Sequence, residues 1–99
     1  MRIKFEWDTE KAESNNKKHR ITFQEAVTVF DDPYALIAPD EKHSTSEETR
    51  EWLIGESDFG VLVVVFTWRM ARTIIRMISA RKASRKERII YEETKTIPL

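Results

Sequence analysis

The chain has 99 residues and no formal net charge; 40% of its residues are hydrophobic, 34% are charged, and none is cysteine. This composition excludes a disordered chain, disulfide bonds and thiolate metal sites. The longest apolar run, VLVVVF at 61–66, is too short to span a bilayer, and the first residues, MRIKFEWD, lack the apolar segment of a signal peptide. We therefore expect a single domain over residues 1–99, cytoplasmic and without a membrane segment.

The zero net charge conceals an uneven distribution along the chain. Residues 31–60 contain nine acidic residues and only two basic ones, Lys42 and Arg50. Residues 61–88 contain eight basic residues and a single acidic one, Glu87. The second segment could therefore bind a polyanion locally, although the same charges could also form an ordinary solvated face.

The first predicted elements are a strand and a polar helix. Residues 3–7 (IKFEW) alternate and are rich in strand-forming side chains. Asp8 can cap a helix over residues 9–19, in which Ala12 is the only apolar residue. Because so polar a helix buries little by itself, we expect neighbouring elements to support it.

A second helix is predicted over residues 21–30. Thr22 and Glu25 have the spacing of a capping box, and the apolar residues that follow recur at helical spacing. The sequence DDP at 31–33 ends this helix.

The rest of the chain predicts a sheet followed by a last helix. Four strands are expected, at residues 34–39, 50–56, 60–69 and 72–81. Residues 57–60 and 70–71 are short enough for hairpin turns, and residues 40–48 are expected to form an exposed loop. The third of these strands is apolar on both faces and is therefore expected in the centre. The order of elements indicates an α+β fold with helices on one side of a mostly antiparallel sheet of four to five strands.

The last helix has an unusual charge at its beginning. Ser84 and Glu87 form a second capping box, so the helix should begin at Arg85. The surrounding residues are nevertheless basic: Arg81, Lys82, Arg85, Lys86 and Arg88. Each exposed cation at a helix N-terminus costs about 0.3–1 kcal/mol. A bound anion would make this arrangement favourable.

Several segments resemble the BrnT family, the toxin components of bacterial toxin–antitoxin pairs. They occur in the family order and cover nearly the whole chain: FEWD (5–8), NNKKHRITFQEA (15–26), FDDP (30–33), DEKHSTSEETR (40–50) and ISARKASRKERIIYE (78–92). One difference is Arg20, where the family usually has a glycine suited to a left-handed turn. The arginine predicts a different turn geometry.

The resemblance implies a compact ribonuclease similar in fold to the RelE toxins, with two N-terminal helices and one C-terminal helix on the sheet. Such toxins cleave RNA without a metal or another cofactor, inhibit translation, and are neutralised by a partner antitoxin, here of the BrnA type. The chain could form a homodimer or a 2:2 complex with that antitoxin. The anion at the last helix would then be an RNA phosphate.

Metal-independent RNA cleavage needs a base for the 2′-hydroxyl, cations for the phosphorane charge and an acid for the leaving oxygen. Arginine binds phosphate with two parallel hydrogen bonds, which suits the second role. We expect Arg81, Arg85 and Lys86 to hold the scissile phosphate, with Ser84 between strand and helix. Ser84 could instead be a simple helix cap.

Both histidines are candidates for function, because histidine side chains titrate near neutrality. His19 follows Lys18 in a turn and is the candidate for acid–base catalysis; it could instead make a structural hydrogen bond. The separation of His19 and His43 along the chain does not indicate that they bind a metal ion together. Arg50 could clamp a phosphate or form a salt bridge with Glu47 or Glu48. The expected RNA-binding residues are Lys18, His43, Arg50, Arg69, Lys82 and Arg88.

Trp52, Trp68 and Tyr91 could stack on bases, or could belong to the core. Two functional hypotheses remain: a ribonuclease toxin, and a non-catalytic module that binds nucleic acid or an antitoxin. They differ in whether a single replacement abolishes cleavage while RNA binding survives.

Overall fold

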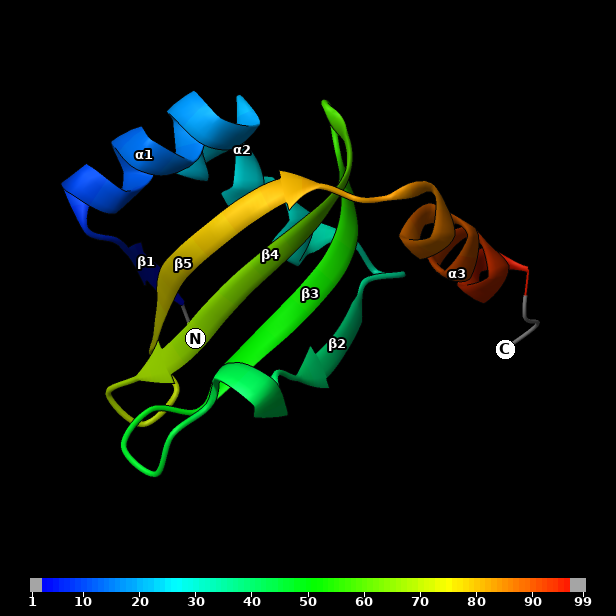
Figure 1. The fold of residues 1–99 in the computed structure, drawn as a ribbon. Helices are drawn as coiled ribbons and strands as arrows, with labels where there is room; N and C mark the ends of the chain where they lie inside the picture. The colour runs from blue at the N-terminus through cyan, green and yellow to red at the C-terminus, as the bar shows by residue number, and fades with distance from the viewer. Residues whose placement is uncertain (1–2, 97–99) are drawn as a thin grey trace.

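A computed structural model describes residues 3–96 and shows an α+β fold (Figure 1), as predicted. The elements are β1 (Lys4–Glu6), α1 (Thr9–His19), α2 (Phe23–Val27), β2 (Leu36–Pro39), β3 (Arg50–Ser57), β4 (Gly60–Arg69), β5 (Ile74–Lys82) and α3 (Arg85–Lys95), with single 3-10 turns at Thr28–Asp31 and Glu41–His43. In the part described, the helices are all too short or too polar to cross a membrane.

The five strands form one mixed sheet in the order β1-β5-β4-β3-β2. β1 runs parallel to β5, and the other neighbouring strands are antiparallel. The central position of β4 confirms the prediction made from its apolar sequence. Leu62 and Val64 are buried on one face of this strand, and Val61 and Val63 are buried on the other.

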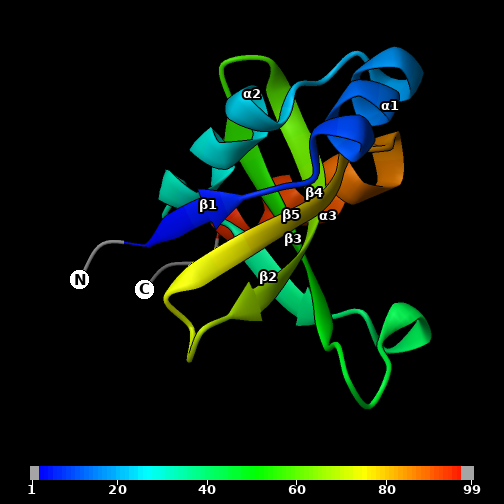
Figure 2. The same cartoon turned by 90° about the vertical axis from the view of Figure 1, so that its left-hand side faces the viewer.

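The helices cover both faces of the sheet. α1 and α2 pack on the first face, and α3 lies across the sheet from them (Figure 1). Figure 2 shows β1 and α1 toward the viewer and α3 behind the sheet. The expectation that all helices lie on one side is therefore wrong. The physical reason is that β4 is apolar on both faces, so each face requires a cover.

Tyr91 fixes α3 to the second face of the sheet. Its side chain is completely buried against Ile54, Val61 and Val63, so it cannot stack on a base as the sequence suggested. Its hydroxyl donates a hydrogen bond to the carboxylate of Asp32. Burial raises the pKa of Tyr91, and the hydrogen bond to Asp32 raises it further.

Asp32 links three segments of the chain. Its carboxylate also accepts hydrogen bonds from the backbone N–H groups of Glu56 (2.7 Å) and Tyr34 (2.9 Å). Burial alone would raise the pKa of Asp32, but these bonds and the one from Tyr91 hold it below its ordinary value. Asp32 therefore ties β3 and α3 to the segment before β2.

The predicted helix starts are confirmed. Asp8 accepts hydrogen bonds from the first turn of α1, and capping boxes begin α2 at Thr22 and α3 at Ser84. α2 is shorter than expected and continues as a 3-10 turn. Thr28 explains this, because its hydroxyl donates to the Glu25 carbonyl at 2.7 Å and competes with regular helical bonding.

Arg20 adopts the left-handed conformation after all, with φ 61° and ψ 29°. The expectation of a different turn is therefore wrong. Its backbone N–H donates to the Asn16 carbonyl at 2.8 Å, which ends α1. The end of α1 requires a left-handed residue at this position, and Arg20 adopts that conformation although it is strained for a residue other than glycine.

Asn15 links α1 to the edge of β5 through buried hydrogen bonds. Among the strands of residues 3–96, β1 pairs with β5 only at residues 74–76, so the rest of that edge of β5 has no strand neighbour there. The buried Asn15 amide replaces one: it donates to the Ala80 carbonyl (2.8 Å) and accepts from the Ala80 N–H (3.0 Å). It also donates to the Ile21 carbonyl (3.1 Å). This network is the support that the polar helix was expected to need.

The turn between β4 and β5 is strained. Met70, Ala71 and Arg72 have φ values of 51°, 53° and 65°, a left-handed conformation in which the side chain approaches the carbonyl oxygen. The sequence predicted a turn here without this feature.

We expect Ala71→Gly to raise the free energy of unfolding by about 0.5–1 kcal/mol. Relief of the left-handed strain contributes about 1–2 kcal/mol, and the greater chain entropy of glycine in the unfolded state removes part of it. Urea unfolding of the two proteins measures the difference. A midpoint that stays the same or falls would contradict the expectation, and Ala71→Val should lower it.

Candidate active site

A groove of about 640 Å³ lies on the second face of the sheet, beside α3. Its floor is apolar and comes from three strands. Trp52 and Ile54 of β3 and Val63 and Val65 of β4 are alternate residues, and Ile78 of β5 lies at the irregularity opposite Val65 and Phe66. Ile90 of α3 borders it. Its polar lining residues are Asp40, His43, Arg50, Ser79, Arg81 and Glu87. α3 covers only one end of this face, so the groove stays open.

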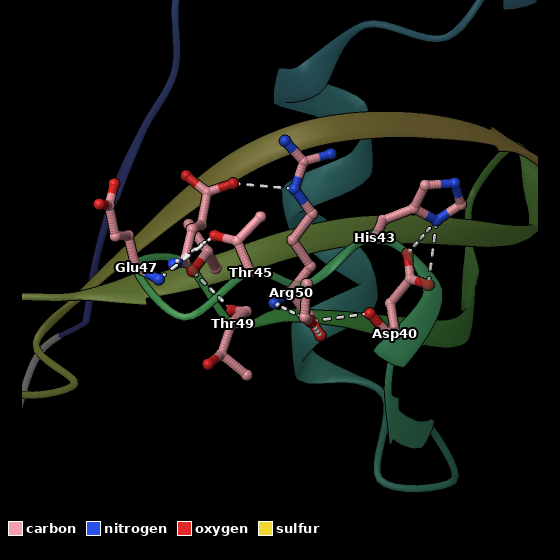
Figure 3. A network of polar contacts seen from close by, with 9 residues as sticks. Asp40, His43, Thr45, Glu47, Thr49 and Arg50 are labelled. Atoms are coloured by element: carbon pink, nitrogen blue, oxygen red, sulfur yellow. Dashed lines mark hydrogen bonds and ion pairs between the residues drawn. The ribbon is translucent and has the colours of Figure 1, made fainter.

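Asp40 and His43 form a pair at the rim of the groove. The 3-10 turn at Glu41–His43 places residues three apart on the same side. The Nδ1 atom of His43 lies 3.1 and 3.0 Å from the two Asp40 carboxylate oxygens (Figure 3). Because a carboxylate accepts, this contact places a ring hydrogen on Nδ1, and in the neutral form of the ring Nε2 is then the acceptor.

The loop that follows is fixed by its own hydrogen bonds. The Ser44 hydroxyl donates to the Asp40 carbonyl (2.7 Å) and accepts from the Arg50 N–H (2.8 Å). The Asp40 N–H donates to the Arg50 carbonyl (2.8 Å). These bonds hold His43 and Arg50 on the same side of the groove (Figure 3).

Arg50 forms the salt bridge that the sequence offered as one of two alternatives. Its Nε donates to Glu48 at 2.8 Å. No bond to its two Nη atoms is found within residues 3–96, so the fork of the guanidinium can still bind an anion.

Arg81 is the penultimate residue of β5 and pairs with Glu87 of α3. The two parallel bonds measure 2.7 and 2.9 Å, and the same carboxylate accepts from the Ser84 N–H at 2.8 Å. The hydrogen bonds from Arg81 lower the pKa of Glu87 to about 2. The hydrogen bond to Glu87 raises the pKa of Arg81. Both groups are therefore ionised at neutral pH, and Arg81 stands at the groove as one half of an ion pair.

This pair predicts an acid-dependent loss of stability. The pKa of Glu87 is lower in the folded chain than its ordinary value of 4.5. Its contribution to folding is therefore fully present above pH 4.5 and is lost as the pH falls toward about 2. The contribution at neutral pH is roughly 1 kcal/mol, because Arg81 is half-exposed and solvent screens the pair. Chemical unfolding of wild type and Glu87→Gln between pH 7 and 2 should show the difference shrinking with acid; a constant difference would contradict it.

The remaining basic residues at the start of α3 do not reach the groove. Arg85 and Arg88 are three residues apart and share the outer side of the helix, where they line a separate shallow hollow. Lys82 and Lys86 are exposed and line neither hollow. The expected convergence of Arg81, Arg85 and Lys86 is therefore not found. Helical periodicity explains this, because Glu87 and Tyr91 occupy the inner side.

Ser84 acts as a helix cap. Its hydroxyl accepts from the Glu87 N–H at 3.2 Å, and the Glu87 side chain accepts from the Ser84 N–H. The structure therefore shows the capping role, which the sequence offered beside a role in phosphate binding.

His19 and Lys18 lie elsewhere, in a hollow formed with Lys11 and Ser14 of α1. This hollow and the groove meet only along β5, where Ile78 and Ser79 line both. The two hollows adjoin along that strand, and His19 is not among the residues that line the groove with Arg81. Arg69 also does not line the groove. Its Nε atom lies 3.8 Å from a carboxylate oxygen of Glu6, and its side chain lines a hollow near the β4–β5 turn.

Of the two tryptophans singled out in the sequence, Trp52 and Trp68, only Trp52 reaches the groove. Trp68 packs edge-on against Phe66 on the first face, and the Arg72 guanidinium lies 5.5 Å above its ring. Sequence analysis missed Asp40 and Glu87 as site residues. The three-residue spacing between Asp40 and His43 could have indicated Asp40. Glu87 was missed because its place in the capping box already gave it a structural role.

Within residues 3–96, no group of three or more His, Asp or Glu side chains is arranged to hold a metal ion. The family model described as the ribonuclease toxin BrnT of type II toxin–antitoxin systems matches residues 7–87, which include all of the groove except Ile90. No curated protein matches the chain.

Proposed function

The chain belongs to the BrnT family of ribonuclease toxins of type II toxin–antitoxin systems, and on this premise we propose that it cleaves RNA without a metal in the groove beside α3. The observation that carries the proposal is the Asp40–His43 pair, which lines one groove together with Arg50 and Arg81. Asp40 and His43 lie in the loop before β3 and Arg50 begins β3, whereas Arg81 comes from β5, much later in the chain.

His43 is the general base in this proposal. Its Nε2 takes the proton of the 2′-hydroxyl while Asp40 stabilises the imidazolium that forms. The 2′-oxygen then forms a bond to phosphorus as the bond from phosphorus to the 5′-oxygen breaks. The products are a 2′,3′-cyclic phosphate and a 5′-hydroxyl, whose proton comes from solvent.

The two arginines stabilise the negative charge of the phosphorane. Arg50 is bound to Glu48 through Nε alone, which supports a role for its Nη atoms in binding a phosphate oxygen pair. Arg81 gives Glu87 one N–H from each Nη atom, so its part in the proposal rests on its remaining N–H groups. Removal of one preorganised hydrogen-bond donor to a transition-state charge typically lowers kcat by a factor of about 10²–10³.

The direct test is incubation of the purified protein with labelled single-stranded RNA, with and without EDTA. Cleavage that persists in EDTA, leaves a cyclic phosphate and stops when the 2′-hydroxyl at the cleaved position is removed would support the proposal. Cleavage that requires an added divalent ion would refute it. Binding without cleavage would favour the non-catalytic module.

The family also implies a protein antitoxin as partner. We place a BrnA-type antitoxin in this role, in a cytoplasmic complex that could be 2:2, and regard residues 1–99 as a single RelE-like domain. Size-exclusion chromatography of the protein co-expressed with any small reading frame that lies beside its gene tests the partnership. Separate elution at micromolar concentration would refute it.

A further inference from the structure

Trp52 occupies a position in the groove that the reaction itself does not explain. The side chain is half-buried, packs against the buried cluster of Ile54, Val61, Val63 and Tyr91, and lines the groove. Besides His43, it is the only aromatic residue among those found to line the groove.

Trp52 and Arg50 lie on the same face of β3. Residues two apart in a strand point to the same side and are separated by about 7 Å along it. A flat apolar ring therefore lies beside a guanidinium whose Nη atoms have no bond in the described chain. Aromatic rings next to cations are how single-stranded nucleic acids are bound, because the ring stacks on a base while the cation holds its phosphate.

We propose that Trp52 stacks on the nucleobase next to the scissile phosphate, so that the substrate is single-stranded RNA. This inference rests on the function proposed above. In a duplex the bases stack on one another and are not available to a side chain, whereas a single strand can turn a base outward. Every base has a π-face, so Trp52 selects the state of the strand and not its sequence.

The rest of the floor suits this occupant. Ile54 and Val63 belong to the cluster against which Trp52 packs and also line the groove, and Ile90 borders the groove from α3 with 45% of its surface exposed. The volume of about 640 Å³ lies in the range of pockets that take a small organic group. The cations stand at the polar rim and the ring on the apolar floor, as the phosphate and the base of one nucleotide require.

The test uses a fluorescent single-stranded RNA whose 2′-hydroxyls are all methylated, which prevents cleavage, and the same sequence as a duplex. Anisotropy gives Kd for wild type, Trp52→Phe, Trp52→Leu and the control Trp68→Leu, with Tm measured for each. We expect Trp52→Leu to weaken single-strand binding by about 5- to 150-fold, as the loss of one stacked base does. Trp52→Phe and Trp68→Leu should bind like wild type.

A second readout does not depend on the leucine variants folding. The single strand should quench the tryptophan fluorescence of wild type, and this quenching should disappear in Trp52→Phe. Unchanged quenching in Trp52→Phe, equal affinity for duplex and single strand, or wild-type binding by a folded Trp52→Leu would each overturn the proposal. So would a Trp52→Leu variant that binds RNA normally but no longer binds the antitoxin.

Cleavage of unmodified RNA by wild type in the same series separates the two proposals. If wild type cleaves RNA and Trp52→Leu cleaves it equally well, the stacking proposal fails and the ribonuclease function stands. If wild type neither binds nor cleaves any RNA, the proposed function fails with it.

Discussion

We expect His43→Asn to cleave RNA about 10²- to 10⁴-fold more slowly than wild type, which is the usual contribution of a positioned acid–base group. The side chain is 58% exposed, and its only bonds within the described chain are to Asp40, so the fold does not depend on it. RNA binding should persist, because Arg50 and Arg81 remain. Single-turnover cleavage and thermal unfolding measure the two effects separately.

His19→Asn is the matched control, since the chain has only two histidines and His19 lies in another hollow. It should cleave at the wild-type rate. Asp40→Asn should lower the rate and alter its dependence on pH, because Asp40 orients the imidazole. If His19→Asn loses activity and His43→Asn keeps it, the site lies beside α1 and the groove has another purpose.

The second large effect concerns stability. We expect Asn15→Ala to lower the free energy of unfolding by about 3–5 kcal/mol. The amide makes three hydrogen bonds to backbone groups of Ala80 and Ile21. Removing the amide leaves those groups buried and unpaired, and each such loss costs about 1–3 kcal/mol.

Asn16→Ala is the control for this experiment. The substitution changes the same residue type in the same helix. The Asn16 side chain, however, is exposed and makes no hydrogen bond within the described residues. Its effect should stay within about 0.5 kcal/mol. Urea unfolding of both variants gives the comparison. Equal midpoints would mean that the bond between α1 and β5 contributes little to stability.

The short-range features of the fold could be predicted from the sequence. Each of the three helix starts is set by side chains and backbone groups within three residues of one another, so Asp8, Thr22 and Ser84 were identified correctly. The central position of β4 also followed, because a strand with no polar face must be covered on both sides. The same observation should have placed a helix on each face.

The groove could not be predicted in this way. His43, Arg50 and Arg81 were each singled out, but nothing local shows that they line one space while His19 and Arg85 line others. That depends on strand order and on the side of α3 that Tyr91 turns inward. Trp52 and Trp68 illustrate the same limit: both lie on strands, yet only Trp52 faces the groove.

The sequence by itself therefore determined the elements, the central strand and the family resemblance, because these depend on spacings within a few residues or on motifs in chain order. The tertiary structure alone decided which charged side chains act together. Arg81 pairs with Glu87, Arg50 with Glu48 and His43 with Asp40. The strand order brings His43, Arg50 and Arg81 to one groove, and the packing of α3 adds Glu87 to it. Charge interactions fall off with distance in space and not along the chain, so only the folded arrangement distinguishes a site from a solvated face.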